Sequence, residues 1–180
     1  MTIASRFARP TVFGALVAGA MILAGGAHSV PGARASDVPA TAEGGGDLSF
    51  VTVQGDFAEV ALDVEDAIVN RGLVIDYHGF VADMLARTAE AVGADQGRPI
   101  YANAEYWQFC SAALSRAMME ADPRNIGYCP YTIVAYELAA SPGEIHVGYR
   151  RPGAAVPEAS MKALSDVDTL LSGIVADATK

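Results

Sequence analysis

Two runs of residues, 131–138 and 144–150, constrain the fold more than any other part of the sequence. The first run, YTIVAYEL, is apolar on nearly all positions of both alternating faces, which is typical of a central strand. A Ser-Pro-Gly turn at 141–143 separates it from the second run, EIHVGYR, which has one apolar face. The side chains that this pattern directs inward are Ile145, Val147 and Tyr149. The two runs therefore predict an antiparallel hairpin.

The remaining elements follow from apolar periodicity. The sequence predicts strands at 48–53, 73–78 and 100–107, and helices after Asp56, from Phe80, over about 109–121 and from Pro157. The first helix is the best marked, because Asp56 is suited to cap its N-terminus and Gly72 to follow its C-terminus. Helical spacing places Met84, Met118 and Met161 on the core-facing sides of the later helices. The order of elements predicts an α+β fold, a mainly antiparallel sheet with helices packed on one face.

The N-terminus has the three parts of a cleavable secretory signal peptide. Arg6 and Arg9 give it a positive start, residues 11–27 carry no charge, and Ala33-Arg34-Ala35 is a small-x-small cleavage pattern. The segment 1–35 contains no Arg-Arg pair, so we expect export by the general secretory route and a periplasmic mature protein. The alternative is that the segment is kept as an uncleaved anchor.

The mature chain divides into a Gly-rich flexible lead-in (36–47), an α+β domain (48–152) and a C-terminal helix (153–180). Loss of the first 35 residues removes three arginines and no acid, which takes the net charge from −9 to −12. So acidic a domain repels a phosphate backbone, and we expect no nucleic-acid partner. No second long apolar run follows, so we expect no stable membrane span after cleavage.

Residues 109–138, FCSAALSRAMMEADPRNIGYCPYTIVAYEL, followed by EIHVGYRRP at 144–152, resemble the bacterial domain of unknown function 302 family. The resemblance lies in a helix with an A-x-x-A-like rhythm that runs into a D-P turn, a short I-G segment, a Cys/Pro step and an apolar strand ending in Y-E. It covers 48–152 and implies a compact α+β fold, a homodimer, no established activity and no catalytic residues. The order Cys129-Pro130, with Cys110 upstream, departs from the family and indicates a secreted subfamily.

The two cysteines of the sequence, Cys110 and Cys129, lie 19 residues apart. In an oxidising compartment such a pair most often forms a structural disulfide, which would stabilise the fold by roughly 3 kcal/mol. One alternative is a redox or sulfur-handling pair, with Cys110 activated near a helix N-terminus. Another is a pair of unbonded, buried thiols. The sequence has no C-x-x-C motif, so thioredoxin-like exchange has little support.

The histidines of the mature chain, His78 and His146, each stand alone on a predicted strand, without a second histidine at i+2 or i+4. A copper site would need distant ligands such as Met84, Met118 or Met119, and helical spacing assigns the first two to the core. We therefore predict no metal and no cofactor, and a metal-binding protein is the weaker alternative.

Aromatic side chains gather on the third to fifth predicted strands, where most should pack in the core and the rest could border a ligand pocket or a dimer face. The candidate residues for a small-molecule pocket are Tyr101, Asn103, Trp107, Tyr128 and Tyr131. Glu105 and Gln108, like Asn103, could supply its polar contacts. Asp63, Glu65 and Asp66 form an acidic cluster on the first helix, and they predict a solvated face.

The sequence carries no G-x-S-x-G, H-E-x-x-H, P-loop or dinucleotide-binding motif. It therefore favours a non-catalytic, exported domain that binds a small ligand or a partner protein, and leaves an enzymatic role open. The alternative from another class is a periplasmic redox or sulfur-handling accessory protein that uses Cys110 and Cys129.

Overall fold

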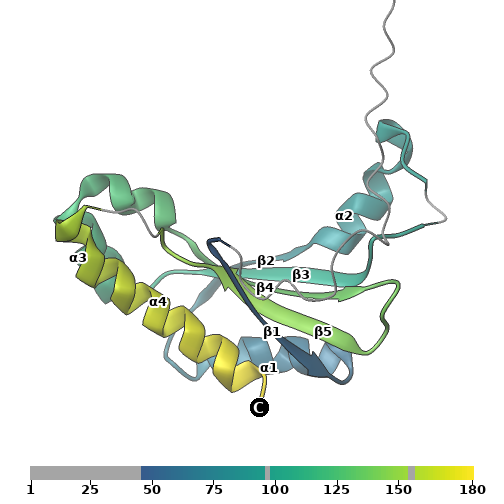
Figure 1. Ribbon diagram of the computed structural model, residues 1–180, viewed down its shortest axis with the longest axis horizontal. Helices are drawn as coiled ribbons and strands as arrows, with labels where there is room; N and C mark the ends of the chain where they lie inside the picture. Colours follow the sequence, from purple (N-terminus) through teal and green to yellow (C-terminus); the bar gives the residue numbers. More distant parts are fainter. Residues whose placement is uncertain (1–45, 96–97, 154–156) are drawn as a thin grey trace, which may run out of the picture. The chain divides into compact units, whose positions relative to one another are not determined.

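The computed structural model describes residues 46–95, 98–153 and 157–180; the predicted signal segment and most of the lead-in lie outside these ranges. In the described chain, strands β1 (Leu48–Gln54), β2 (Ile75–Phe80), β3 (Tyr101–Phe109), β4 (Tyr131–Leu138) and β5 (Glu144–Arg150) form one antiparallel sheet in the order β1-β5-β4-β3-β2 (Figure 1). The helices are α1 (Phe57–Val69), α2 (Val81–Thr88), α3 (Ala112–Ala121) and α4 (Glu158–Ala178), with short 3₁₀ helices η2 (Glu90–Val92) and η3 (Pro123–Tyr128). The predicted α+β fold is confirmed. No described helix has both the length and the apolar character that crossing a bilayer requires.

The predicted hairpin is confirmed with the same bounds. β4 and β5 pair from Ile133 opposite Tyr149 to Glu137 opposite Ile145. The side chains predicted to point inward are all buried. Because β4 is apolar on both faces, it lies at the centre of the sheet, and β1 and β2 form the edges.

Helices α1 and α4 cover one face of the sheet, which we call the inner face (Figure 1). α1 packs on β2, β3 and β4, α4 packs on β4 and β5, and the two helices pack against each other. The large side chains fully buried between these layers are Val64, Ile68, Trp107, Phe109, Ile133, Ile145, Val147, Val167 and Ile174. The inward side chains, which recur every two residues in the strands, and the apolar stripe of each helix thus pack together in a single core.

Local signals fix both ends of α1, as predicted. Oδ1 of Asp56 accepts hydrogen bonds from the backbone N–H groups of Ala58 (2.9 Å) and Glu59 (3.2 Å). After the helix, Gly72 adopts a φ of +73°, a left-handed conformation that glycine tolerates and that turns the chain toward β2.

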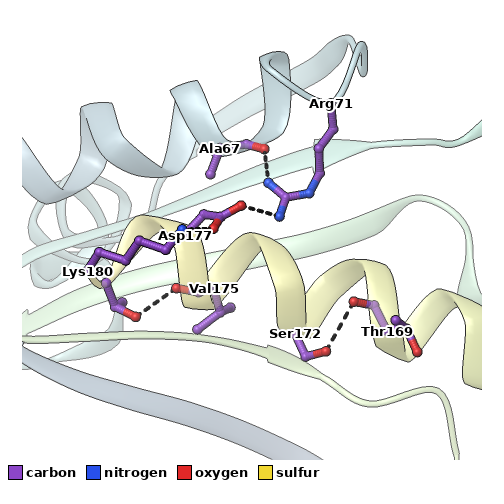
Figure 2. A network of polar contacts seen from close by, with 8 residues as sticks. Ala67, Arg71, Thr169, Ser172, Val175, Asp177 and Lys180 are labelled. Carbon is purple, nitrogen blue, oxygen red and sulfur yellow. Dashed lines mark hydrogen bonds and ion pairs between the residues drawn. The ribbon is translucent and has the colours of Figure 1, made fainter.

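Arg71, just after α1, ties this helix to α4 (Figure 2). Its Nη1 donates a hydrogen bond to the backbone carbonyl of Ala67 at 2.6 Å, and its Nη2 donates to the carboxylate of Asp177. Asp177 also pairs with Lys180. The arginine thereby satisfies a carbonyl in the last turn of α1 and joins the C-terminal ends of the two helices.

The observed bounds of β2, β3 and α3 differ from the predicted ones. β2 begins two residues later than expected, and it also ends two residues later because Gly79 and Phe80 still pair with β3. β3 extends to Phe109, which pairs with Tyr131, so α3 begins at Ala112 and Cys110 precedes the helix. Both strands end later than expected because their last residues pair with a distant strand, which local sequence patterns do not report.

No residue of α2 is buried, although its periodicity predicted a core-facing side. Met84 is 41% exposed, whereas Met118 of α3 is fully buried. Figure 1 places α2 on the opposite side of the sheet from α1 and α4. Met161, in the first turn of α4, is 51% exposed. The core positions predicted for Met84 and Met161 were therefore wrong, because spacing identifies an apolar side but burial requires an element that covers it.

Candidate functional site

The inner face of the sheet changes from apolar to polar along β3 and β4. On β3, Phe109 and Trp107 are fully buried beneath the helices, and the next inward positions are Glu105 and Asn103. On β4, the apolar side chains likewise give way to Glu137, which lies opposite Asn103. Because inward positions recur every two residues, these polar side chains gather at one end of the inner face.

A cavity of about 760 Å³ lies between this polar end and the first half of α1. Its polar lining consists of Asp56, Glu65, His78, Asn103, Glu105 and Glu137. Its other lining residues are Gly55, Phe57, Ala58, Ala61, Leu62, Phe80 and Gly143. The cavity therefore has a polar wall, built mainly from the sheet, and an apolar wall, built mainly from α1.

His78, from β2, lies at the centre of the polar wall. Its Nε2 is 2.7 Å from Oε2 of Glu105, and its Nδ1 is 3.3 Å from Oε1 of Glu65. A carboxylate oxygen only accepts, so Nε2 is the donor to Glu105. The imidazole also stacks on Trp107 and contacts Phe80, with ring centroids 4.8 Å and 4.5 Å apart. Two carboxylates and two aromatic rings thus fix its orientation.

Glu65 connects α1 to the core. Its Oε1 accepts a hydrogen bond of 3.1 Å from Nε1 of Trp107, whose side chain is fully buried. This bond satisfies the polar atom of a tryptophan that water does not reach. The predicted solvated face is therefore confirmed for Asp63 and Asp66, which are exposed, and only in part for Glu65, whose side chain is 37% exposed and also bonds to the core.

Glu137 borders the cavity near the β4–β5 turn and is 9% exposed. Its Oε2 accepts a hydrogen bond from Nδ2 of Asn103 at 2.6 Å, and its Oε1 accepts one from the backbone N–H of Gly143 at 2.7 Å. Both donors are neutral. The two bonds therefore satisfy the carboxylate oxygens without cancelling the charge.

The five residues proposed from the sequence as a ligand pocket lie in different places. Asn103 lines the cavity, and Trp107 lies in the core beneath it. Tyr128 and Tyr131 line a smaller hollow of about 220 Å³. Tyr101 packs edge-on against another tyrosine of β4, with centroids 5.5 Å apart. Of the five, only Asn103 lines the larger cavity.

Sequence reasoning named Asn103 and Glu105 as polar contacts of a pocket, and both line the cavity, whereas Gln108 does not. It missed Glu65, His78 and Glu137 as members of the same site. A usable signal was the spacing of Asn103, Glu105 and the core residue Trp107 on β3. They are two residues apart, so their side chains point to the same face of the sheet. The partners from β2 and α1 left no such signal, because they are distant in the sequence.

Cys110 and Cys129 lie after β3 and just before β4, and their side chains are in contact. Both are free thiols in the structure. Burial, together with the neighbouring thiol of Cys129, raises the pKa of Cys110 to about 11. The Sγ atom of Cys129 is also 3.7 Å from Oγ of Ser115. The structure thus brings the two cysteines together, and the disulfide between them stays a prediction.

His146 lies on the opposite, outer face of the sheet from His78. Its Nδ1 is 2.9 Å from Oγ1 of Thr52, and its ring stacks on Tyr136 with centroids 4.6 Å apart. Among the residues that the structure describes, no group of three or more His, Cys, Asp or Glu side chains is arranged to hold a metal ion. The sheet keeps the two histidines from sharing a ligand.

Comparisons with known proteins agree with this fold. No curated protein matches the chain. A crystal structure of an uncharacterized conserved DUF302 protein from Bacillus stearothermophilus is similar, with a TM-score of 0.59 and 16% sequence identity over 74% of this chain and 98% of that chain. The family model for the domain of unknown function DUF302 matches residues 50–178, so the match runs through α4. The chain therefore belongs to the DUF302 family.

Proposed function

We propose that this protein is exported and binds a small organic molecule in the cavity beside α1. The observation that carries the proposal is the wall of Glu65, His78 and Glu105, which three different elements hold around a hollow of about 760 Å³. Small-molecule sites typically measure about 300–1,000 Å³ and combine apolar walls with a few oriented polar groups. The cavity has both features.

A purely structural role is the rival explanation for the polar cluster. The core does use part of it, since Glu65 satisfies the buried N–H of Trp107. However, Glu65 and Glu105 each keep one carboxylate oxygen that receives no hydrogen bond from the described residues. Their side chains also remain 37% and 20% exposed. Oriented acceptors that border a hollow support ligand binding.

A thermal-shift screen of small molecules tests this proposal, because a ligand of the native state raises the Tm. Ala61→Trp places an indole in the cavity, and Asp63→Trp places the same group on the exposed side of the same helix as a control. We expect to find ligands that raise the Tm of both the native protein and Asp63→Trp but leave the Tm of Ala61→Trp unchanged. A screen without such ligands, or equal stabilisation of all three proteins, would contradict the proposal.

A second candidate is a redox or sulfur-handling role for Cys110 and Cys129, which the contact between the two thiols favours. In such an exchange the pair is oxidised to a disulfide, a partner protein's disulfide is reduced to two thiols, and the two protons pass to the partner's sulfurs. The raised pKa of Cys110 opposes rapid attack, because the thiolate is the nucleophile. The contact, taken together with this raised pKa, therefore supports a structural disulfide more strongly than a reactive pair.

Alkylation with mass spectrometry, before and after reduction, distinguishes these roles, and two free thiols in the native oxidised protein would contradict the disulfide. If the bond is structural, Cys129→Ser should lower the free energy of unfolding by about 3 kcal/mol. If the pair is reactive, the same variant should keep its stability and lose thiol–disulfide exchange with a disulfide reagent.

We also propose that residues 1–35 are cleaved on export to the periplasm and that the mature protein is a homodimer. The signal pattern supports export, and the uncovered apolar side of α2, where Met84 and Leu85 are exposed, supports an interface. The mass of the periplasmic protein should correspond to a start at Ser36. Sedimentation equilibrium should give twice the monomer mass. A full-length, membrane-bound chain would refute the proposed cleavage. A monomer at micromolar concentration would refute the proposed homodimer.

A further inference from the structure

We propose that the cavity beside α1 selects an organic cation, a protonated amine attached to a hydrophobic body. This inference rests on the proposed function and adds the chemical class of the ligand. Hydrogen bonding gives the first argument, because the side-chain donors of the wall already meet carboxylates. His78 donates to Glu105, and Asn103 donates to Glu137.

The acceptors of the wall, in contrast, are in excess. Oε2 of Glu65, Oε1 of Glu105 and Oδ2 of Asp56 receive no hydrogen bond from the described part of the chain. A ligand that presented acceptor groups here would leave acceptors facing acceptors, whereas N–H groups would satisfy them. The cavity is therefore complementary to a hydrogen-bond donor.

Charge gives the second argument. Four carboxylates line the cavity, and its described lining includes neither lysine nor arginine. Glu137 receives both of its hydrogen bonds from neutral N–H groups, which leave the negative charge in place. The basic side chain of the described lining is His78. A carboxylate attracts a cation more strongly in a partly enclosed site than in bulk water. The same field repels an anionic ligand.

The apolar wall gives the third argument. Phe57, Ala61 and Leu62 of α1 line the cavity together with Phe80, which ends β2. Phe80 is 49% exposed, although its ring contacts His78. A hydrophobic body would cover this surface, and an aromatic ring face attracts a cation held near it. An arylalkylamine has both of the required parts.

Three probes of nearly equal shape test the inference: phenethylamine, 2-phenylethanol and phenylacetate, which carry a positive, neutral and negative group on the same ring. Their affinities are measured by ¹H–¹⁵N NMR titration of the purified protein at pH 7, which also shows where each probe binds. We expect phenethylamine to bind at least about tenfold more tightly than the alcohol, with shifts at Ala61 and Glu105, and phenylacetate to bind most weakly.

Isosteric variants show whether the carboxylates cause this order. Glu105→Gln and Glu65→Gln should reduce the preference for the amine over the alcohol, and Asp63→Asn, which removes an exposed charge from the same helix, should leave it unchanged. Equal or tighter cavity binding of the alcohol or the carboxylate would overturn the inference and leave the proposed function intact. Absence of cavity binding by all three probes would also overturn it. In that case the wider thermal-shift screen decides the proposed function separately.

Discussion

Replacement of Gly148 by alanine tests how closely β1 and β5 approach on the outer face of the sheet. Gly148 lies opposite Phe50 in the register of the two strands. A Cβ atom at Gly148 would lie 2.4 Å from Cδ1 of Phe50 and 2.3 Å from the backbone oxygen of Ser49. Movement of the whole Phe50 side chain relieves the first contact. The second is a backbone contact, so the pair of strands must separate.

The expected effect follows from this difference between a side-chain and a backbone contact. Added volume in a tightly packed position destabilises proteins by about 1–3 kcal/mol. For a chain of this length each kcal/mol lowers the Tm by about 2–4 °C, so Gly148→Ala should lower it by roughly 2–12 °C. Urea denaturation followed by circular dichroism measures the corresponding change in the free energy of unfolding.

Two further glycines provide matched controls. A Cβ at Gly79 would lie 2.3 Å from the ring of Tyr106, whose side chain can swing aside, and a Cβ at Gly127 would meet nothing within 4 Å. The loss of stability should therefore decrease in the order Gly148→Ala, Gly79→Ala, Gly127→Ala, with the last within about 0.5 kcal/mol of the native protein. If Gly148→Ala were as stable as Gly127→Ala, the close approach of β1 and β5 would be refuted.

Other predictions concern the core and the thiols. Ile174→Ala should lower the free energy of unfolding by about 2–5 kcal/mol, because the side chain is fully buried; a loss below 1 kcal/mol by urea denaturation would contradict this packing. Ser160→Ala should cost about 1–3 kcal/mol in the same assay, since the buried Oγ accepts a hydrogen bond of 2.9 Å from Nδ2 of Asn125; an unchanged stability would contradict that bond. The pKa of Cys110, raised from 9.0 to about 11, means that the thiolate becomes its main form only above about pH 11. At pH 8, alkylation of Cys110 by iodoacetamide in the reduced protein, followed by mass spectrometry, should be up to about 100-fold slower than that of an ordinary thiol. The rate should keep rising toward pH 11, and a plateau by about pH 10 would refute the shift.

The parts of the fold that could be predicted from the sequence are those with strong local signals. The hairpin of β4 and β5 combines two apolar runs with a Ser-Pro-Gly turn, and its bounds were found without error. The start of α1 was found because Asp56 caps it, and its end because Gly72 takes a left-handed conformation. In each of these cases the residues that determine the structure are neighbours in the chain.

Burial was harder to predict, because it depends on what faces a side chain. Met84 and Met118 occupy similar helical positions in the sequence pattern, yet only Met118 is covered. Glu65 belongs to a sequence cluster with Asp63 and Asp66, which are exposed, and spacing alone assigned it to solvent. The partner that directs its Oε1 toward the core is Trp107, which lies 42 residues further along the chain. A helical period reports direction around an axis and contains no information about such a partner.

The candidate site depends on one quantity that sequence patterns leave undetermined, the register between β2 and β3. His78 faces the cavity because it lies opposite Trp107, so that both side chains point to the inner face. A slip of one residue would direct His78 outward and bring Gly79 or Tyr77 inward. A tight turn fixes the register of β4 and β5, but 20 residues, from 81 to 100, separate β2 from β3. The contacts of His78 with Glu105 and Trp107 therefore arise from tertiary packing. This is why a histidine that appeared isolated in the sequence lies at the centre of the polar wall.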